Sequence, residues 1–460
     1  MRTIRTIRTI RTLLFGAAMA TLALPASAEV VAITGAKVLT GTAVIENGTV
    51  VMDGATIVSV GTGAAPAGAR IIDGRGKTVS PGFVAVDSGL GGSEVSSVSG
   101  SNDLSNNANT ISASFDVSYG LDPWSFTLPV ARTGGITRAI VVPAHPGGGG
   151  GNGNHKDDGE DDFAGAGEGG FQSPGLFAGQ AAIITLAQGT DILVKPRVAM
   201  VAPFGEAGAG VAGGARGAEF TLFKESLAEV RLYARNKAAY DRAGLRDLSL
   251  SRADLEALIP VANGTMPLIV TVHRASDILQ VLRLAEEEGV KVILDGAEEG
   301  WLVAPQIAAA KAPVLLNPIS NLPGSLETRA SRMENAAALN AAGVVIAIKG
   351  NEGSVHRARE ARYNAGNAVS HGLPYAAAIA ALTVNPARIF GEGGVFGELI
   401  PGAQADVVIW SGDPLEPLTT ASQVFISGVE QPMETRQFQL RDRYRNGGAG
   451  ANGMPAAYSR

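Results

Sequence analysis

The chain has 460 residues, of which 45% are hydrophobic and 17% charged, and it contains 60 glycines and 23 prolines. This composition excludes a disordered chain and is typical of a packed α/β protein with many tight turns, long enough for one large domain and a smaller one. No cysteine is present, which excludes disulfides, thiolate metal sites and a cysteine nucleophile.

Residues 1–28 have the pattern of a secretory signal peptide. Four arginines (Arg2, Arg5, Arg8 and Arg11) precede the apolar run LLFGAAMATLALP, and small residues end the segment at Ala26-Ser27-Ala28. The apolar run is shorter than the roughly 18 to 20 residues that a membrane span needs. We therefore expect cleavage after Ala28 and a periplasmic or secreted protein without a membrane span.

Charge bears on the possible partners of the mature chain. Removing the four arginines of the leader from the 37 lysines and arginines leaves 33 against 43 acidic residues, a net charge of −10. Such an acidic chain is not expected to bind nucleic acid.

Both ends of the mature chain have the sequence pattern of β-strands. Short runs of Val, Ile and Thr alternate with Gly and Asn turns in residues 29–77, and the same texture returns near the C-terminus. We expect one small β-sandwich domain assembled from residues 29–77 and 388–436, followed by a flexible tail over 437–460.

Residues 78–387 alternate between apolar strands and amphipathic helices. The strands are expected at 268–274, 290–294, 313–317 and 344–348, and the helices at 276–289, 301–312, 329–343 and 375–390. Apolar strands joined by crossover helices predict a parallel sheet covered on both faces. About 300 residues of this pattern fit a (β/α)8 TIM-like barrel; an open doubly wound sheet is the alternative, but it lacks a Gly-rich phosphate motif.

One segment of the barrel region, 145–175, is rich in glycine and acidic residues. It has almost nothing to bury and is expected to be a surface insertion. Its two histidines and the DDGEDD run could chelate a cation loosely, but a solvated linker is favoured, because the spacing of a Ca²⁺ loop is missing.

The expected first barrel strand lies in PGFVAVDSGLGG, residues 81–92, and few reactive side chains follow it. The strand at 83–86 is followed by Asp87 and small residues, without a histidine. Barrel enzymes place their reactive groups where strands end in Gly-rich loops. This strand end carries few reactive side chains, which is unusual for such a position.

Several stretches resemble the amidohydrolase superfamily, in its imidazolonepropionase-like and dihydroorotase-like branch. They are GRGKTVSPGFVAVDSGLG, GGITRAIVVP with GLFAGQAAIITL, VTVHRASDI, GAEEGWLVAPQIAAAKAPVLLNP, LTVNPARIFG and GELIPGAQADVVIWSGDPLE. The resemblance implies hydrolysis of a non-peptide carbon–nitrogen bond in an amide or a cyclic amide. It also implies one or two metal ions at the C-terminal mouth of the barrel, which activate a water molecule.

The metal ligands that the resemblance implies are mostly replaced here, which identifies a divergent member with a degenerate ligand set. The first-strand histidine pair falls on Asp87 and Gly89, the fourth-strand bridging ligand on Val201, and the sixth-strand histidine near Asp295 or Gly296. The eighth-strand aspartate becomes Asn351, and only the fifth-strand ligand is retained, as His273.

A lone imidazole does not form the usual three-ligand zinc site. We therefore expect no metal cofactor. The alternative is a divalent cation, Mn²⁺ or Mg²⁺, in a non-standard oxygen-rich site that includes Asp87, His273, Asp295 and Glu298 or Glu299.

Two functions remain open from the sequence. The first is a C–N hydrolase whose catalytic groups are Asp87, His273 and Asp295, with Glu298, Lys349 and Asn351 binding substrate. The second is a non-catalytic pseudoenzyme that binds a small molecule or a periplasmic partner on the same scaffold. In both, Lys349 is expected to neutralise Asp87 or Asp295 where a metal would lie, and self-association is possible.

Overall fold

The computed structural model describes residues 29–95, 98–106, 111–144, 175–320, 322–350 and 355–445. The predicted signal peptide, the insertion up to residue 174, Asn351 and the tail from residue 446 lie outside these ranges. The described chain forms two eight-stranded sheets, sheet A and a nearly closed barrel, which confirms the predicted fold class.

The barrel strands follow one another in chain order around the sheet, from β6 to β13. Their bounds are β6 Phe83–Ser88, β7 Ile136–Val141, β8 Gly179–Thr185, β9 Leu193–Pro203, β10 Leu268–Val272, β11 Val292–Gly296, β12 Val314–Leu316 and β13 Ile346–Ile348. The pairs from β9 to β13 are parallel, as the sequence pattern predicts.

The barrel departs from eight-fold βα repetition at β8. This strand pairs antiparallel with both β7 and β9. The connection between β8 and β9 is only the segment 186–192, too short for the crossover helix that a parallel neighbour needs. Expecting eight repeated βα units was therefore wrong at this strand.

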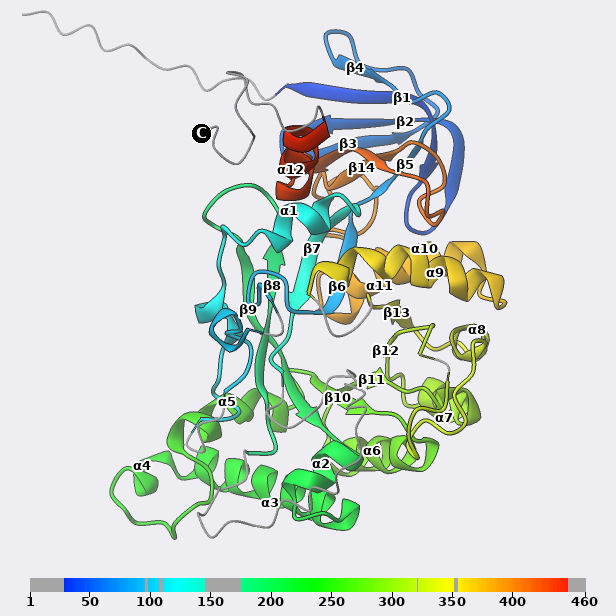
Figure 1. Ribbon diagram of the computed structural model, residues 1–460. Helices are drawn as coiled ribbons and strands as arrows, with labels where there is room; N and C mark the ends of the chain where they lie inside the picture. Colours follow the sequence, from blue (N-terminus) through cyan, green and yellow to red (C-terminus); the bar gives the residue numbers. More distant parts are fainter. Residues whose placement is uncertain are drawn as a thin grey trace, which may run out of the picture.

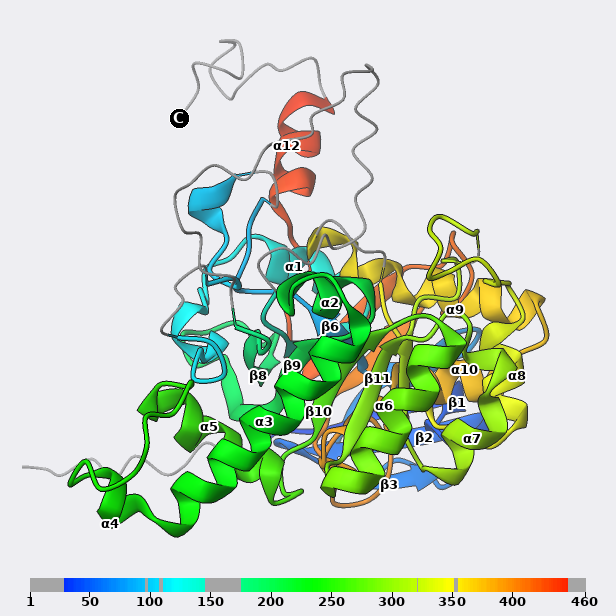
Figure 2. The same ribbon diagram turned by 90° about the horizontal axis from the view of Figure 1, so that it is seen from below.

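The inside of the barrel is an apolar core. Aliphatic side chains from every barrel strand meet there, with Phe390 and Phe396 closing one end. A second and larger cluster lies outside the strands, against the helices. Figure 2 shows α3, α6, α7 and α8 around the strands. The barrel is thus a packed scaffold whose chemistry is confined to its ends.

The helices are shorter than some of the predicted ones. Their bounds are α1 Thr127–Arg132, α2 Glu206–Val211, α3 Arg216–Arg235, α4 Lys237–Tyr240, α5 Arg252–Ala262, α6 Ala275–Glu288, α7 Ala304–Ala309, α8 Asn335–Ala341, α9 Ala361–Ser370, α10 Tyr375–Leu382, α11 Val384–Ile389 and α12 Arg436–Arg445. Short 3₁₀ segments lie at Ser99–Ser101, Val117–Gly120, Gly300–Leu302 and Val355–Glu360.

Two helix ends are explained by the residues found there. Gly289 adopts φ 68° and ends α6, as a left-handed C-terminal glycine does. The single helix expected over 375–390 is instead two, α10 and α11, which meet at Thr383. Pro386 lacks the N–H that would bond back to Leu382, so the helix breaks at that point.

Sheet A joins the two ends of the chain. It contains β1 Val30–Leu39, β2 Val44–Asp53, β3 Thr56–Gly61, β4 Arg70–Asp73, β5 Thr78–Pro81, β14 Val407–Trp410, β15 Ala421–Ile426 and β16 Val429–Glu430. The antiparallel pair β5–β14 connects the N-terminal strands to the C-terminal ones. Figure 1 shows sheet A above the barrel, with α12 beside it.

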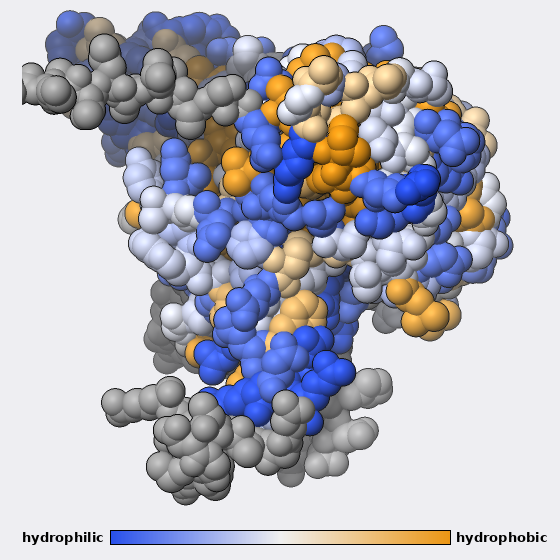
Figure 3. All heavy atoms as spheres, turned by 90° about the horizontal axis from the view of Figure 1, so that it is seen from above, coloured by the Kyte–Doolittle hydropathy of each residue, from blue (hydrophilic) through white to orange (hydrophobic). Residues whose placement is uncertain are grey.

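Seen from the side of sheet A, hydrophilic side chains cover much of the surface, and apolar ones gather in separate patches (Figure 3). Among the described residues, no helix is both long and apolar enough to cross a bilayer.

Candidate active site

Asp87 owes its position to a bulge in the first barrel strand. Between the pairs Ala85↔Ala139 and Ser88↔Val141, strand β6 has one residue more than β7. Asp87 adopts φ 49° in this bulge, a left-handed conformation that aspartate tolerates better than most residues. The bulge brings the carboxylate within reach of the last barrel strand.

Lys349 follows β13 and lies between two carboxylates. Its Nζ donates to Oδ2 of Asp87 and to Oδ1 of Asp295, each at 2.7 Å. Only 4% of the Lys349 side chain is exposed, against 26% for Asp87 and 8% for Asp295. The predicted neutralisation by Lys349 is therefore confirmed, and it involves both aspartates.

Buried amides hold the backbone of this lysine. Asn364, on α9, donates through Nδ2 to the carbonyl of Lys349 at 2.9 Å and to Oδ1 of Asn317 at 3.1 Å. Asn317 directly follows β12, so these contacts tie the ends of two neighbouring strands to a helix. Such support fixes a charged side chain more precisely than a free loop would.

His273 and Glu298 form a second charged pair at the ends of β10 and β11. Nδ1 of His273 lies 2.5 Å from Oε2 of Glu298. Burial alone lowers the pKa of His273, but the hydrogen bond and charge of Glu298 outweigh it. With the nearby charges of Asp295 and Glu327, they raise the pKa to about 9. The imidazole is therefore protonated at neutral pH.

The residues present do not fit the metal site of the resemblance. A Cβ on Gly89 would lie 2.9 Å from Leu104 and 3.1 Å from Val355, and one on Gly296 would lie 2.5 Å from Nδ1 of His273. Even a Cβ at either position crowds the neighbouring side chains, and the ammonium of Lys349 lies between the two aspartates. Within the described ranges, no three His, Asp or Glu side chains group as a metal site.

Glu299 has a structural role. Its carboxylate accepts from the N–H of Ala275 at 3.0 Å and from that of Ala330 at 3.1 Å. It thereby holds the first turn of α6 and the loop after β12. The sequence offered Glu299 as a ligand of a non-standard cation site; its carboxylate instead joins α6 to the loop after β12.

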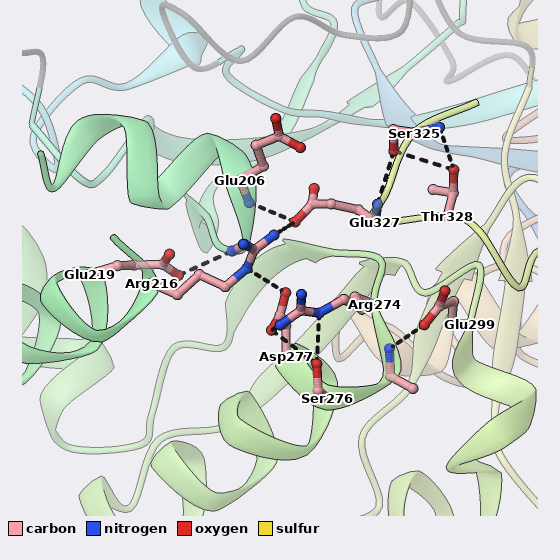
Figure 4. A network of polar contacts seen from close by, with 12 residues as sticks. Glu206, Arg216, Glu219, Arg274, Ser276, Asp277, Glu299, Ser325, Glu327 and Thr328 are labelled. Atoms are coloured by element: carbon pink, nitrogen blue, oxygen red, sulfur yellow. Dashed lines mark hydrogen bonds and ion pairs between the residues drawn. The ribbon is translucent and has the colours of Figure 1, made fainter. Parts of the chain in front are cut away.

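A network of ion pairs borders the same end of the barrel (Figure 4). Arg216 reaches between Asp277, at 2.9 Å, and Glu327, at 2.6 Å. Glu327 also accepts from the N–H of Glu206 at 2.7 Å, and Arg274 donates to Asp277 at 3.0 Å. These contacts connect the loops after β9, β10 and β12.

Glu219 is the buried acid of this network. Its side chain is fully buried; Oε1 accepts from the N–H of Gly205 at 3.2 Å, while Oε2 has no hydrogen-bond partner. Burial raises the pKa of Glu219 to about 8, against the lowering effect of that backbone N–H. The carboxyl is therefore largely neutral at pH 7.

Residues 234–431 match the model of the amidohydrolase family. This part of the chain resembles the amidohydrolases. A crystallised amidohydrolase from Thermotoga maritima MSB8 superposes with a TM-score of 0.72 at 24% identity, over 87% of this chain and 99% of that one. A molinate hydrolase aligns with a TM-score of 0.50 at 17% identity, over 88% and 95%.

One curated sequence also matches a short part of this chain. This chain is 43% identical to amidohydrolase tasK of Hapsidospora irregularis over 61 residues, 13% of its length. The match spans only 6% of that protein's length.

The structure brings together most of the predicted site residues. Asp87, Asp295 and Lys349 are in direct contact, and His273 contacts Glu298. Asn351 lies outside the described residues, and Val201 lies in the barrel core. Sequence reasoning missed Arg216, Glu219, Glu327 and Asn364, because spacing along a helix or loop does not reveal contacts between distant segments.

Proposed function

We propose that the protein hydrolyses a carbon–nitrogen bond of an amide or cyclic amide at the C-terminal mouth of the barrel. The observation that carries this proposal is the Lys349 ammonium, held between Asp87 and Asp295 beside the His273–Glu298 pair. In this proposal Lys349 supplies the positive charge that a metal supplies elsewhere, and chemistry proceeds through protein side chains.

The proposed roles follow from exposure and charge. Asp87 has the most exposed carboxylate of the Lys349 cluster, at 26%, so it accepts a proton from water. The hydroxide attacks the carbonyl carbon, and Lys349 stabilises the oxyanion, with Asp295 fixing its position. His273, protonated, gives its proton to the leaving nitrogen as the C–N bond breaks, and the proton on Asp87 then restores the imidazolium.

Glu298 and Lys349 also position the substrate in this proposal. Glu298 occupies Nδ1 of His273, which leaves Nε2 to face the leaving group. The pKa of about 9 for His273 predicts activity that falls as pH rises above that value, because the proton donor is then lost. A Glu298→Gln variant removes the charge that raises this pKa, so its alkaline limb moves to lower pH.

The test is hydrolysis of a panel of cyclic ureides, lactams and aryl amides, with product amine measured from pH 6 to pH 10. Asp87→Asn should lower the rate by about 10² to 10⁴, while Asp53→Asn, exposed on β2, should leave it unchanged. Equal rates in wild type and Asp87→Asn, or an alkaline limb unmoved in Glu298→Gln, would overturn the proposal.

A second candidate is a non-catalytic binding protein on the same scaffold. It is favoured by the pairing of Lys349 with both aspartates, which gives both carboxylates a structural role in holding the ammonium. A small molecule retained equally by wild type and Asp87→Asn, with no turnover of any panel member, would support it. In either case we propose export by a Sec-type signal with cleavage after Ala28, which N-terminal sequencing of the mature protein tests.

A further inference from the structure

A broad pocket lies at the other end of the barrel, away from Lys349. It has a volume of about 1180 Å³ and opens where β9, β10, β11 and β12 begin, between α6, α7 and α11. The candidate active site stands at the opposite ends of these strands, so the pocket is a separate site.

The floor of the pocket is apolar. Val198, Ile293 and Phe390, which line it, belong to the buried core of the barrel. Leu282 of α6 and Met266 before β10 extend this floor, and Leu279 remains 39% exposed beside it. An apolar surface of this kind gains free energy when a hydrocarbon group covers it.

The rim of the pocket is basic. Its lining includes six cationic side chains and one acidic one, Glu286. Four of the cations have carboxylate partners: Lys195 with Glu392, Arg197 with Asp116, Arg283 with Glu287 and Arg388 with Glu398.

Two of the lysines on this rim are uncompensated. Within the described part of the chain, the side chains of Lys291 and Lys311 have no ion-pair or hydrogen-bond partner. Lys291 directly precedes β11, and Lys311 follows α7 with a backbone φ of 54°. The pocket therefore joins an apolar floor to two free positive charges, although the chain as a whole is acidic.

We propose that this pocket binds an amphipathic organic anion, an apolar chain ending in a carboxylate. The chain lies over Val198, Ile293 and Phe390, and the carboxylate is bound by Lys291 and Lys311. Charge complementarity supports this occupant: a neutral hydrocarbon leaves both ammonium groups without a partner, and a cationic peptide is repelled.

The test is calorimetric titration of the mature protein with decanoate below its micelle concentration, with acetate and 1-decanol as controls. We expect saturable binding of decanoate, much weaker binding of acetate, and a loss of about tenfold or more in affinity in Lys291→Gln/Lys311→Gln. Lys37→Gln, at a half-exposed lysine of sheet A, is the matched control and should bind as wild type.

Three results would overturn the proposal: no saturable heat with decanoate, unchanged affinity in the double variant, or equal affinity for decanol. A fourth contradicting result is dimerisation of the protein, which light scattering detects. A concentration-dependent dimer abolished by Ala309→Glu, at an exposed position of α7 in the pocket lining, would show that a second copy is the occupant instead.

Discussion

Lys349 lies between Asp87 and Asp295 with 4% of its side chain exposed. A buried ion cluster contributes less than its Coulomb energy, because each charge has lost its hydration. Removing one member is nevertheless costly, since the remaining charges then lack a counterion.

We predict that Lys349→Met lowers the free energy of unfolding by about 3 kcal/mol. The methionine preserves the shape of the side chain but leaves Asp87 and Asp295 facing each other. Urea unfolding of the mature protein measures the change, with Lys37→Met as the exposed control. A loss equal to that of the control would mean that the cluster does not need its cation.

Glu219 gives a pH-dependent prediction. Its pKa of about 8 in the folded protein exceeds the ordinary glutamate value of about 4.3, so the unfolded chain releases this proton first. Glu219 therefore destabilises the fold progressively as pH rises from about 4.3 to 8, and fully above that.

We expect the stability of Glu219→Gln relative to wild type to rise by a few kcal/mol between pH 5 and pH 9. Unfolding curves at pH 5, 7 and 9 measure it. Glu225→Gln, exposed on the same helix, should show no such slope. A Glu219→Gln difference that stays constant over this range would contradict the assigned protonation state.

At the scale of elements, the ends of β10 and β11 depend on one close approach. Gly296 adopts φ 91°, and a Cβ there would lie 2.5 Å from Nδ1 of His273. Any side chain at this position must displace the imidazole from Glu298.

We predict that Gly296→Ala lowers the pKa of His273 from about 9 toward its ordinary value of about 6.5, because the contact with Glu298 is lost. NMR titration of the imidazole measures it. Gly217→Ala, on α3 in open space, is the control, and an unchanged His273 titration in Gly296→Ala would refute the contact.

Some elements of the fold are predictable from the sequence and others are not. Periodicity identified α6 and its Gly289 end, because both signals are local. It missed the break at Thr383 and the reversed strand β8, since these depend on packing between elements. The Asp87–Lys349 contact was anticipated because both residues lie at strand ends of one barrel; the Arg216 network was not, as its members come from unrelated loops.

At the scale of the whole molecule, one buried ion pair links the barrel to sheet A. Arg138 of β7 donates to both oxygens of Asp406, at 2.6 and 3.1 Å. The two side chains are 4% and 1% exposed. Arg138 also donates to Gln404 at 2.6 Å, so its guanidinium is fixed at the junction of the two sheets.

We predict that Arg138→Met costs about 3 to 5 kcal/mol, because Asp406 becomes a buried unpaired charge. Arg138→Met/Asp406→Leu removes both charges and should recover much of this loss. Calorimetric unfolding compares the two variants. Equal destabilisation of the single and double variants would indicate that packing, rather than charge, joins the sheets.

The most direct test of the account is the metal content of the purified, signal-cleaved protein, measured by plasma mass spectrometry beside a His273→Ala variant. Because Lys349 lies between the aspartates, and glycines stand at 89 and 296 where imidazoles would be needed, we predict only trace Zn and Mn in both proteins. Near-stoichiometric metal in the wild type that disappears in His273→Ala would contradict the account and show that a metal, not the ammonium, organises the site.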